Sequence, residues 1–254
     1  MSNSNPSLPT IIAHRGNAAE FPENTLAALA SAVELGLRHV ELDVHLTADH
    51  VPVVIHDADL QRVGGRPDSV HALTWPQLAE VPVGEVDRLG DRFAHTCAPS
   101  LAQFVDALAQ WDGVTAFVEI KRASLRRFGH ELVLRRVAEV LHPVRDRCVL
   151  ISFDLAAVKI VRLMTGARIG WVSERYDEDT RQTVADLAPD FMFGNIERIP
   201  SGIEALWSGP WDWALYEVRD LVTARRCRQL GAPYVETMAV RELQRAYAEA
   251  GPAA

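Results

Sequence analysis

The stretch TIIAHRGNAAEFPENTLAALASAVELGLRHVELDVH, residues 10–45, decides the fold. An apolar run at 10–15 predicts a strand, and the segment 24–36, which starts on Asn-Thr and ends on glycine, predicts a capped helix. A second strand is expected at 39–45. Two strands joined through a helix in this way run parallel, so the stretch is one strand–helix–strand unit of an α/β protein.

The same alternation of short apolar runs and helical patterns continues to the end of the chain. Further strands are expected at 51–56, 115–121, 148–153, 167–173, 191–195, 213–218 and 233–238. Further helices are expected at 99–111, 125–142, 154–166, 178–188, 219–231 and 240–251. About eight such units in 254 residues match the size of a closed (β/α)8 TIM barrel. An open doubly wound sheet is the alternative, but no glycine-rich phosphate motif follows the first strand.

Two parts of the chain fall outside this alternation. Residues 1–9 are rich in Pro, Ser and Asn, which predicts a loose N-terminal tail. Residues 57–98 are interrupted by glycines and prolines and contain little that reads as regular strand. Long insertions in compact domains are commonly functional or mobile. We therefore expect 57–98 to be a small insertion over the barrel mouth, within a single domain that spans 10–254.

The composition excludes several classes of protein. The chain is 48% hydrophobic and carries a formal net charge of -8, which is enough apolar material for a large core but no basic surface for nucleic acid. Three widely spaced cysteines predict neither a disulfide framework nor a thiolate metal site. The N-terminus reads unlike a secretory signal, and no apolar run reaches the roughly 18 residues of a membrane span. The expectation is a cytoplasmic protein, and nothing in the sequence predicts an oligomeric state.

The segment VELDVHLT, residues 40–47, places Glu41, Asp43 and His45 on one face of its strand and apolar residues on the other. Carboxylates that point into a barrel are costly unless they are paired or hold a metal ion. Residues two apart on a strand lie roughly 7 Å apart, so Glu41 and Asp43 can reach one divalent cation. A solvated edge strand, or carboxylates paired with arginines, would explain the same pattern.

Five further polar residues stand near the carboxyl ends of expected strands: His14, Arg15, His56, Glu119 and Lys121. In a barrel these ends converge on one mouth, where active sites lie. Taken singly, the second histidine fits a solvated strand end, and the Glu–Lys pair fits a structural ion pair. Together with Glu41 and Asp43, these five residues suit a single kind of site, one that binds a metal ion and a phosphate and moves protons. Three carboxylates suit a divalent cation, first Mg²⁺ or Ca²⁺ and also Mn²⁺, while Arg and Lys suit a phosphate and two histidines suit an acid and a base.

The chain resembles the glycerophosphodiester phosphodiesterase family in a series of motifs that come in the family's order. They are HRG (14–16), PENT (22–25), ELDVHLTADHVPVVIHD (41–57) followed by Arg62, PSL (99–101), EIK (119–121) and SFD (152–154). The resemblance implies a TIM barrel with a small insertion after the His-Asp motif. It also implies hydrolysis of a small-molecule glycerophosphodiester to sn-glycerol 3-phosphate and an alcohol, with a divalent cation as cofactor.

The resemblance also implies a role for each matching position. His14 and His56 match the acid/base pair, Glu41, Asp43 and Glu119 match the metal ligands, and Arg15 and Lys121 match the phosphate contacts. In the mechanism usually proposed for the family, the substrate's own glycerol hydroxyl attacks phosphorus and water then opens a cyclic phosphate. Direct attack by water fits this sequence equally well.

The chain departs from the family near its last strands, at ALYEVRD (214–220) and VETMAV (235–240). These segments replace a Trp-Thr-x-Asn run and a Thr-Asp pair, so the head-group side of the pocket is where we expect a difference. Phe153, Trp171 and Tyr216 stand near strand ends and are candidates for an apolar pocket wall, with ordinary barrel core as the alternative. A lysophospholipase D-type or other phosphodiesterase activity, or a catalytically degenerate barrel that binds phosphodiesters, remain the alternative functions.

Overall fold

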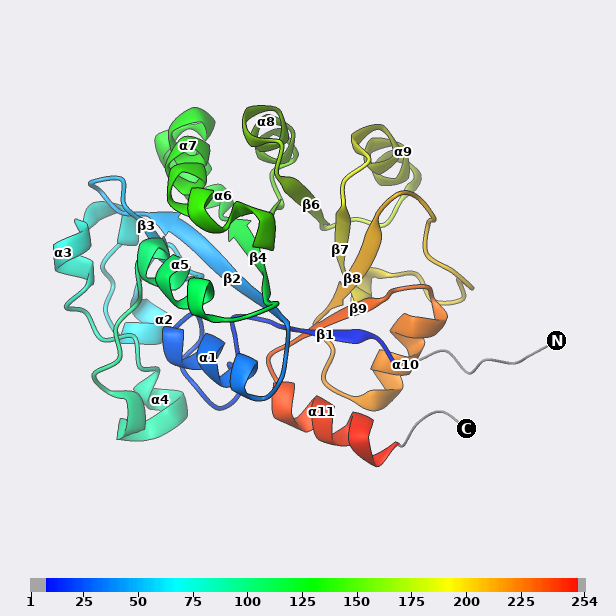
Figure 1. Ribbon diagram of the computed structural model, residues 1–254, viewed down its shortest axis with the longest axis horizontal. Helices are drawn as coiled ribbons and strands as arrows, with labels where there is room; N and C mark the ends of the chain where they lie inside the picture. Colours follow the sequence, from blue (N-terminus) through cyan, green and yellow to red (C-terminus); the bar gives the residue numbers. More distant parts are fainter. Residues whose placement is uncertain (1–7, 251–254) are drawn as a thin grey trace.

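A closed parallel barrel forms the centre of the protein (Figure 1), in a computed structural model that describes residues 8–250. Its sheet has the order β1-β9-β8-β7-β6-β5-β4-β2-β3, and β1 also pairs with β2, which closes the ring. The eight parallel strands are β1 (Thr10–Ala13), β2 (His39–Leu46), β4 (Thr115–Ile120), β5 (Cys148–Ser152), β6 (Arg168–Ser173), β7 (Phe191–Asn195), β8 (Asp212–Tyr216) and β9 (Tyr234–Thr237). The predicted TIM barrel is confirmed, and the open-sheet alternative is excluded because an open sheet has two free edges.

Helices surround the barrel between successive strands (Figure 1). They are α1 (Leu26–Glu34), α5 (Leu101–Gln110), α6 (Arg122–Phe128), α7 (His130–Leu141), α8 (Leu155–Thr165), α9 (Glu178–Leu187), α10 (Leu221–Gln229) and α11 (Val240–Glu249). Five of them begin at a side chain that accepts a backbone N–H of the first turn: Thr25, Ser100, Asp154, Asp177 and Asp220. Such caps satisfy backbone donors that a helix leaves unpaired, and they fix where each helix starts.

Strand side chains alternate between two apolar layers. On β7, Met192 joins the large cluster shared with the helices, whereas Phe191 and Phe193 join a second cluster inside the barrel. Gly170 on β6 makes room for these rings, since a Cβ atom there would lie 3.2 Å from both phenylalanines. Packed aromatic and aliphatic side chains therefore fill much of the barrel interior, and the buried carboxylates Glu41, Asp43 and Glu119 lie above them toward the mouth.

The prediction that residues 51–56 form a parallel strand of the barrel is wrong. Only Pro52–Val54 forms a strand, β3, and it pairs antiparallel with β2 in the register Val44↔Val54. The reason is the connection, since residues 47–51 are far too few for the crossover of a dozen or more residues that a parallel pair needs. β3 is therefore a hairpin extension of β2, and the barrel strand that follows β2 is β4.

The segment 57–98 forms short helices around its own apolar cluster, beside β3 at the left of Figure 1. They are α2 (Gln61–Gly64), α3 (Trp75–Leu78) and α4 (Val86–Leu89), with 3-10 turns at Val70–Ala72 and Gly90–Phe93. Glu85 accepts the backbone N–H of Glu23, and Arg88 donates to the carbonyl oxygens of Ala18 and Phe21. The segment is thus held against the loop that follows β1. Residues 1–7 of the predicted tail lie outside the described residues.

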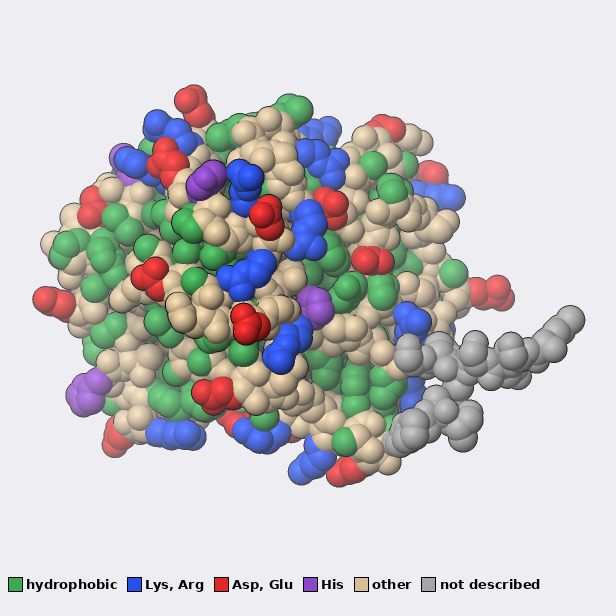
Figure 2. Space-filling view, viewed as in Figure 1, with side chains coloured by type: hydrophobic (Ala, Val, Ile, Leu, Met, Phe, Trp, Pro, Cys, Tyr) green, Lys and Arg blue, Asp and Glu red, His purple; other side chains and the backbone are tan. Residues whose placement is uncertain are grey.

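The face seen in Figure 2 carries acidic and basic side chains that are interspersed with each other and with apolar ones. Single apolar side chains on a surface are ordinary in proteins. Within residues 8–250, no helix has both the length and the apolar character that crossing a membrane requires.

Candidate active site

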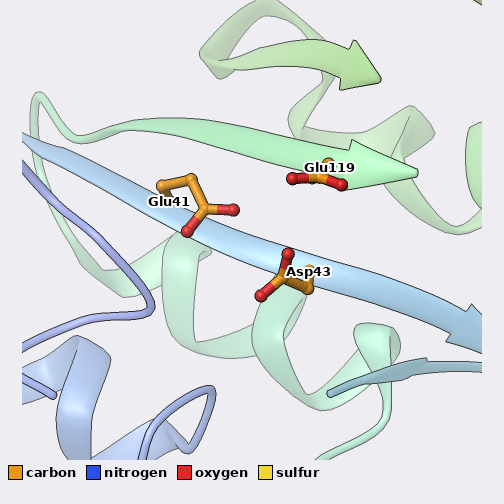
Figure 3. A group of neighbouring side chains, drawn as sticks. All are labelled: Glu41, Asp43 and Glu119. Atoms are coloured by element: carbon orange, nitrogen blue, oxygen red, sulfur yellow. The ribbon is translucent and has the colours of Figure 1, made fainter. Parts of the chain in front are cut away.

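Three carboxylates meet inside the barrel near the ends of two neighbouring strands. Glu41 and Asp43 come from β2 and Glu119 comes from β4, and Figure 3 shows the three groups converging. The register pairs Asp43 with Glu119, which brings these two side by side. One oxygen from each residue lies within 4.8 Å of the others, and all three side chains are buried. The predicted metal ligands therefore form one compact cluster.

Burial and mutual repulsion shape the charges of this cluster. The pKa of Glu41 is raised well above its usual value by burial and then by the neighbouring Asp43. Burial alone would raise the pKa of Asp43 as well, but Lys121 and Arg15 outweigh it and lower that pKa. Within the described chain, Glu41 Oε1 is buried without a hydrogen-bond partner. A buried carboxylate oxygen with no donor, beside two further carboxylates, fits a divalent cation, which prefers oxygen ligands.

Two cations lie against the carboxylates. Lys121 Nζ is 3.1 Å from Asp43 and 2.8 Å from Glu119, and these contacts raise the pKa of the lysine despite its burial. Arg15 Nη1 donates to Glu23 at 3.0 Å, and its Nε lies 3.3 Å from Asp43. That Nε makes no hydrogen bond within residues 8–250. Both predicted phosphate-binding residues thus stay charged at the mouth.

The loop after β1 is shaped so that these residues reach the cluster. Arg15 and Gly16 both have positive φ, 57° and 82°, which turns the chain sharply at the strand end. A Cβ atom on Gly16 would lie 2.5 Å from the backbone carbon of Ala28, so only glycine fits between the loop and α1. Asn24 then clamps Asp43, since its Nδ2 donates to the carboxylate at 2.8 Å and its Oδ1 accepts the backbone N–H at 3.0 Å.

The two predicted acid/base histidines each bind a carboxylate through Nδ1. His14 contacts Glu217 at 2.7 Å, and its Nε2 is 4.0 Å from Glu41. His56 contacts Asp57 at 2.6 Å. Because a carboxylate accepts, Nδ1 carries the proton in both rings, and Nε2 remains for the site. Burial lowers the pKa of His56, whereas Glu236 and Glu217 overcome the effect of burial and raise the pKa of His14.

The sequence analysis did not identify several residues that lie around the site. Glu217 follows β8 inside ALYEVRD, and Glu236 lies within β9 inside VETMAV, the two segments expected only to alter the pocket. Burial raises the pKa of Glu236 to about 7, and its Oε1 has no hydrogen-bond partner in the described part of the chain. Its alternation with buried apolar Val235 was the available signal, the same one that identified Glu41. Glu23 and Asn24 were contained in the PENT motif, but Asn24 was interpreted only as a helix start and Glu23 was given no role of its own.

The three predicted wall residues fall in different places. Phe153 lines a cavity of about 430 Å³ together with His56 and Lys121. Tyr216 lies inside the barrel, with its ring centroid 6.5 Å from that of His14. Trp171 packs outward in the cluster between the sheet and the helices, so the structure does not bring it together with the other two. The reason is strand alternation, since its neighbour Val172 takes the inward position on β6.

His45 is a structural residue. It is 1% exposed, its Nδ1 lies 2.9 Å from Ser124 Oγ, and its Nε2 lies 3.0 Å from the carbonyl oxygen of His56. Burial lowers its pKa to about 3. The ring therefore stays neutral and ties the backbone of His56 to β2 and α6.

This burial predicts a pH dependence of stability. The folded pKa of about 3 lies below the unfolded value of 6.5, so the unfolded chain binds the extra proton between these values. The free energy of unfolding should then fall as pH drops below 6.5, by about 1.4 kcal/mol per pH unit from this residue. Urea unfolding from pH 7 to 4 in the presence of a chelator measures the slope. His45→Gln should flatten it, and an unchanged slope in that variant would contradict the assignment.

Fold and site together define a (β/α)8 barrel whose mouth carries a buried carboxylate triad between two histidine–carboxylate pairs. The sequence model of the glycerophosphoryl diester phosphodiesterase family matches residues 14–237, and the chain belongs to this family. The predicted family membership is thereby confirmed.

Individual relatives agree with this assignment. A glycerophosphodiester phosphodiesterase of Caldanaerobacter subterraneus is 31% identical over 155 residues, which cover 61% of this chain and 62% of that protein. The match thus spans a little under two thirds of the relative. A putative glycerophosphoryl diester phosphodiesterase of Silicibacter pomeroyi has the same fold, with a TM-score of 0.83, 22% identity and coverage of 97% and 95% of the two chains. An Oleispira antarctica phosphodiesterase, solved in complex with the product sn-glycerol-3-phosphate, has a TM-score of 0.80, 21% identity and coverage of 94% and 96%.

Proposed function

We propose that this protein is a metal-dependent glycerophosphodiester phosphodiesterase, which hydrolyses small glycerophosphodiesters to sn-glycerol 3-phosphate and an alcohol. The observation that carries the proposal is the carboxylate triad lying between two histidine–carboxylate pairs at one barrel mouth. Membership of the family supports it. The product bound to the Oleispira antarctica relative, which has the same fold, supports the choice of substrate class.

Glu41, Asp43 and Glu119 would hold a divalent cation, with Mg²⁺ or Ca²⁺ as first candidates and Mn²⁺ as a third. When bound, such a cation withdraws charge from a phosphoryl oxygen and lowers the pKa of a coordinated hydroxyl group. Arg15 and Lys121 flank the triad and would take the remaining phosphate oxygens, Arg15 through its planar fork and Lys121 as a point charge. Their ion pairs with buried carboxylates keep both cations in place before substrate arrives.

The two histidines would move protons at their Nε2 atoms. One takes the proton from the attacking hydroxyl group, of the substrate or of water, and the other gives a proton to the leaving alkoxide oxygen. Glu217 and Asp57 fix the ring tautomers through Nδ1, which would leave Nε2 for the proton transfers at the phosphate. The opposite pKa shifts of His14 and His56 support such a division of labour, since one ring favours its charged form and the other its neutral form.

Activity should appear only when a divalent cation is supplied. We expect release of sn-glycerol 3-phosphate from glycerophosphodiesters with Mg²⁺, Ca²⁺ or Mn²⁺, and a loss of at least about a hundredfold with excess EDTA. The measurement is a coupled assay for sn-glycerol 3-phosphate with each metal in turn. Lysophosphatidylcholine, offered in parallel, tests the lysophospholipase D-type alternative. No turnover of any glycerophosphodiester with any of the three metals would refute the proposed function.

A further inference from the structure

The cavity of about 430 Å³ extends from the catalytic residues toward solvent. Its lining contains His56, Glu119 and Lys121, and further residues from the loop after β3 and from helix α6. This volume lies in the range of roughly 300–1,000 Å³ that holds small ligands. A phosphate placed against Lys121 fills only a part of it. The rest is room for one of the two alcohol groups that the phosphate joins.

Most of the charges around this cavity are already paired. Asp57 accepts from Arg62 at 2.7 Å and contacts His56, while Lys121 lies between Asp43 and Glu119. Arg122 donates to both carboxylate oxygens of Glu174, at 3.0 and 3.1 Å, and its guanidinium lies 5.1 Å above the Phe153 ring. These groups build a fixed wall in which each charge already has a partner, and Lys121 is the one among them that would also meet the phosphate.

Two rim residues differ from the rest. Asp59 lies two residues after Asp57, and Arg126 lies on α6. Both residues line the cavity, and both are exposed. Within residues 8–250 neither forms an ion pair with any charged side chain or with the other. Among these described residues, the single hydrogen bond that the Asp59 carboxylate accepts is from the backbone N–H of Gln61, at 3.0 Å. The mouth of the cavity therefore offers one uncommitted anion and one uncommitted cation from two different elements.

We propose that this cavity receives the alcohol group of the substrate and that Asp59 and Arg126 favour an alcohol that carries both an ammonium and a carboxylate group, as in a serine head group. The inference rests on the proposed function and names its substrate class. An ammonium group would contact Asp59, and a carboxylate would accept from the guanidinium of Arg126. Choline and ethanolamine can make only the first contact, and a glycerol head group can make neither ion pair.

The experiment compares three substrates: glycerophosphoserine, glycerophosphoethanolamine and glycerophosphoglycerol. In the wild-type protein, glycerophosphoserine should have the highest kcat/KM. Arg126→Gln should raise the KM for glycerophosphoserine about fivefold. The KM values for the other two substrates should stay within about twofold of the wild-type values. Asp59→Asn should raise the KM for both amine-bearing substrates and leave the KM for glycerophosphoglycerol unchanged. In all cases kcat should change little, because neither residue touches the phosphate.

Arg127→Gln is the matched control, since Arg127 is the next residue on α6 and loses the same charge, but its guanidinium lies over Phe128 outside the cavity. This variant should leave the KM for each of the three substrates within about twofold of the wild-type value. An equal change for every substrate in Arg126→Gln, or the same change in Arg127→Gln, would show a general field effect and overturn the inference. So would a wild-type protein that does not prefer glycerophosphoserine. Failure to cleave any of the three would overturn the proposed function itself, and with it this inference.

Discussion

Glu41→Gln is expected to abolish turnover and metal-dependent stabilisation while the metal-free protein becomes more stable. The glutamine keeps the shape of the side chain but removes a buried charge that lies beside Asp43 and Glu119. Without metal, relief of this repulsion should raise the free energy of unfolding. Activity should fall by at least about a hundredfold, because a ligand of the catalytic cation is lost.

Thermal unfolding with EDTA and with each divalent cation measures both effects at once. For the wild type, a cation at a hundred times its dissociation constant should add about 2.7 kcal/mol. Glu41→Gln should lack this gain. Glu34→Gln, which removes an exposed charge on α1, should behave as the wild type does. If Glu41→Gln keeps the stabilisation by metal, Glu41 is not a ligand.

Asp43 offers a useful contrast within the same cluster. Asp43→Ala should also lose metal binding and turnover, but its metal-free form should become less stable. The carboxylate accepts from Asn24 and pairs with both Lys121 and Arg15, so its removal leaves two buried cations short of a partner. The opposite effects of Glu41→Gln and Asp43→Ala on stability would separate the ligand role, which they share, from the ion pairs with Lys121 and Arg15, which Asp43 makes and Glu41 does not.

The barrel was predictable because its signal is local and repeated. Each strand–helix unit carries its own apolar pattern and caps, such as Thr25 before α1 and Asp154 before α8. An error in the prediction of one unit therefore does not change the predicted fold. The hairpin β2–β3 was missed for a different reason. Its strand resembles the others in composition, and only the shortness of the 47–51 connection distinguishes an antiparallel neighbour from a parallel one.

The carboxylate triad could be inferred because period-two alternation puts a strand's polar residues on one face, and barrel closure brings the strand ends together. The partners of the histidines could not be inferred in the same way. Glu217 is 203 residues from His14, and their contact depends on how β8 and β1 curve around the mouth. Trp171 could be named only as a candidate for the pocket wall, because a strand end alone does not reveal which of two adjacent residues points inward.

The second large effect is expected from the histidines. His14→Ala and His56→Ala should each lower kcat by about 10²- to 10⁴-fold, the usual contribution of a general acid or base. Stabilisation by metal should persist in both, since neither ring belongs to the triad. His95→Ala, which removes an exposed histidine in the 57–98 segment, is the control and should leave kcat unchanged. If either catalytic-site variant loses the metal-induced shift in unfolding, that histidine is a ligand and its assigned role is wrong.

Glu217→Gln tests how His14 works. The amide can still contact Nδ1, but it no longer carries the charge that helps to raise the pKa of the ring. Turnover should fall less than in His14→Ala, by about tenfold, with KM unchanged, because the ring stays in place and only its proton affinity changes. An acid and a base acting together give a bell-shaped dependence of kcat/KM on pH. In Glu217→Gln, the limb that belongs to His14 should move to lower pH, while the other limb stays where it is. A uniform loss of activity with an unchanged profile would mean that Glu217 only supports the backbone at Met238, whose N–H it also accepts at 2.8 Å.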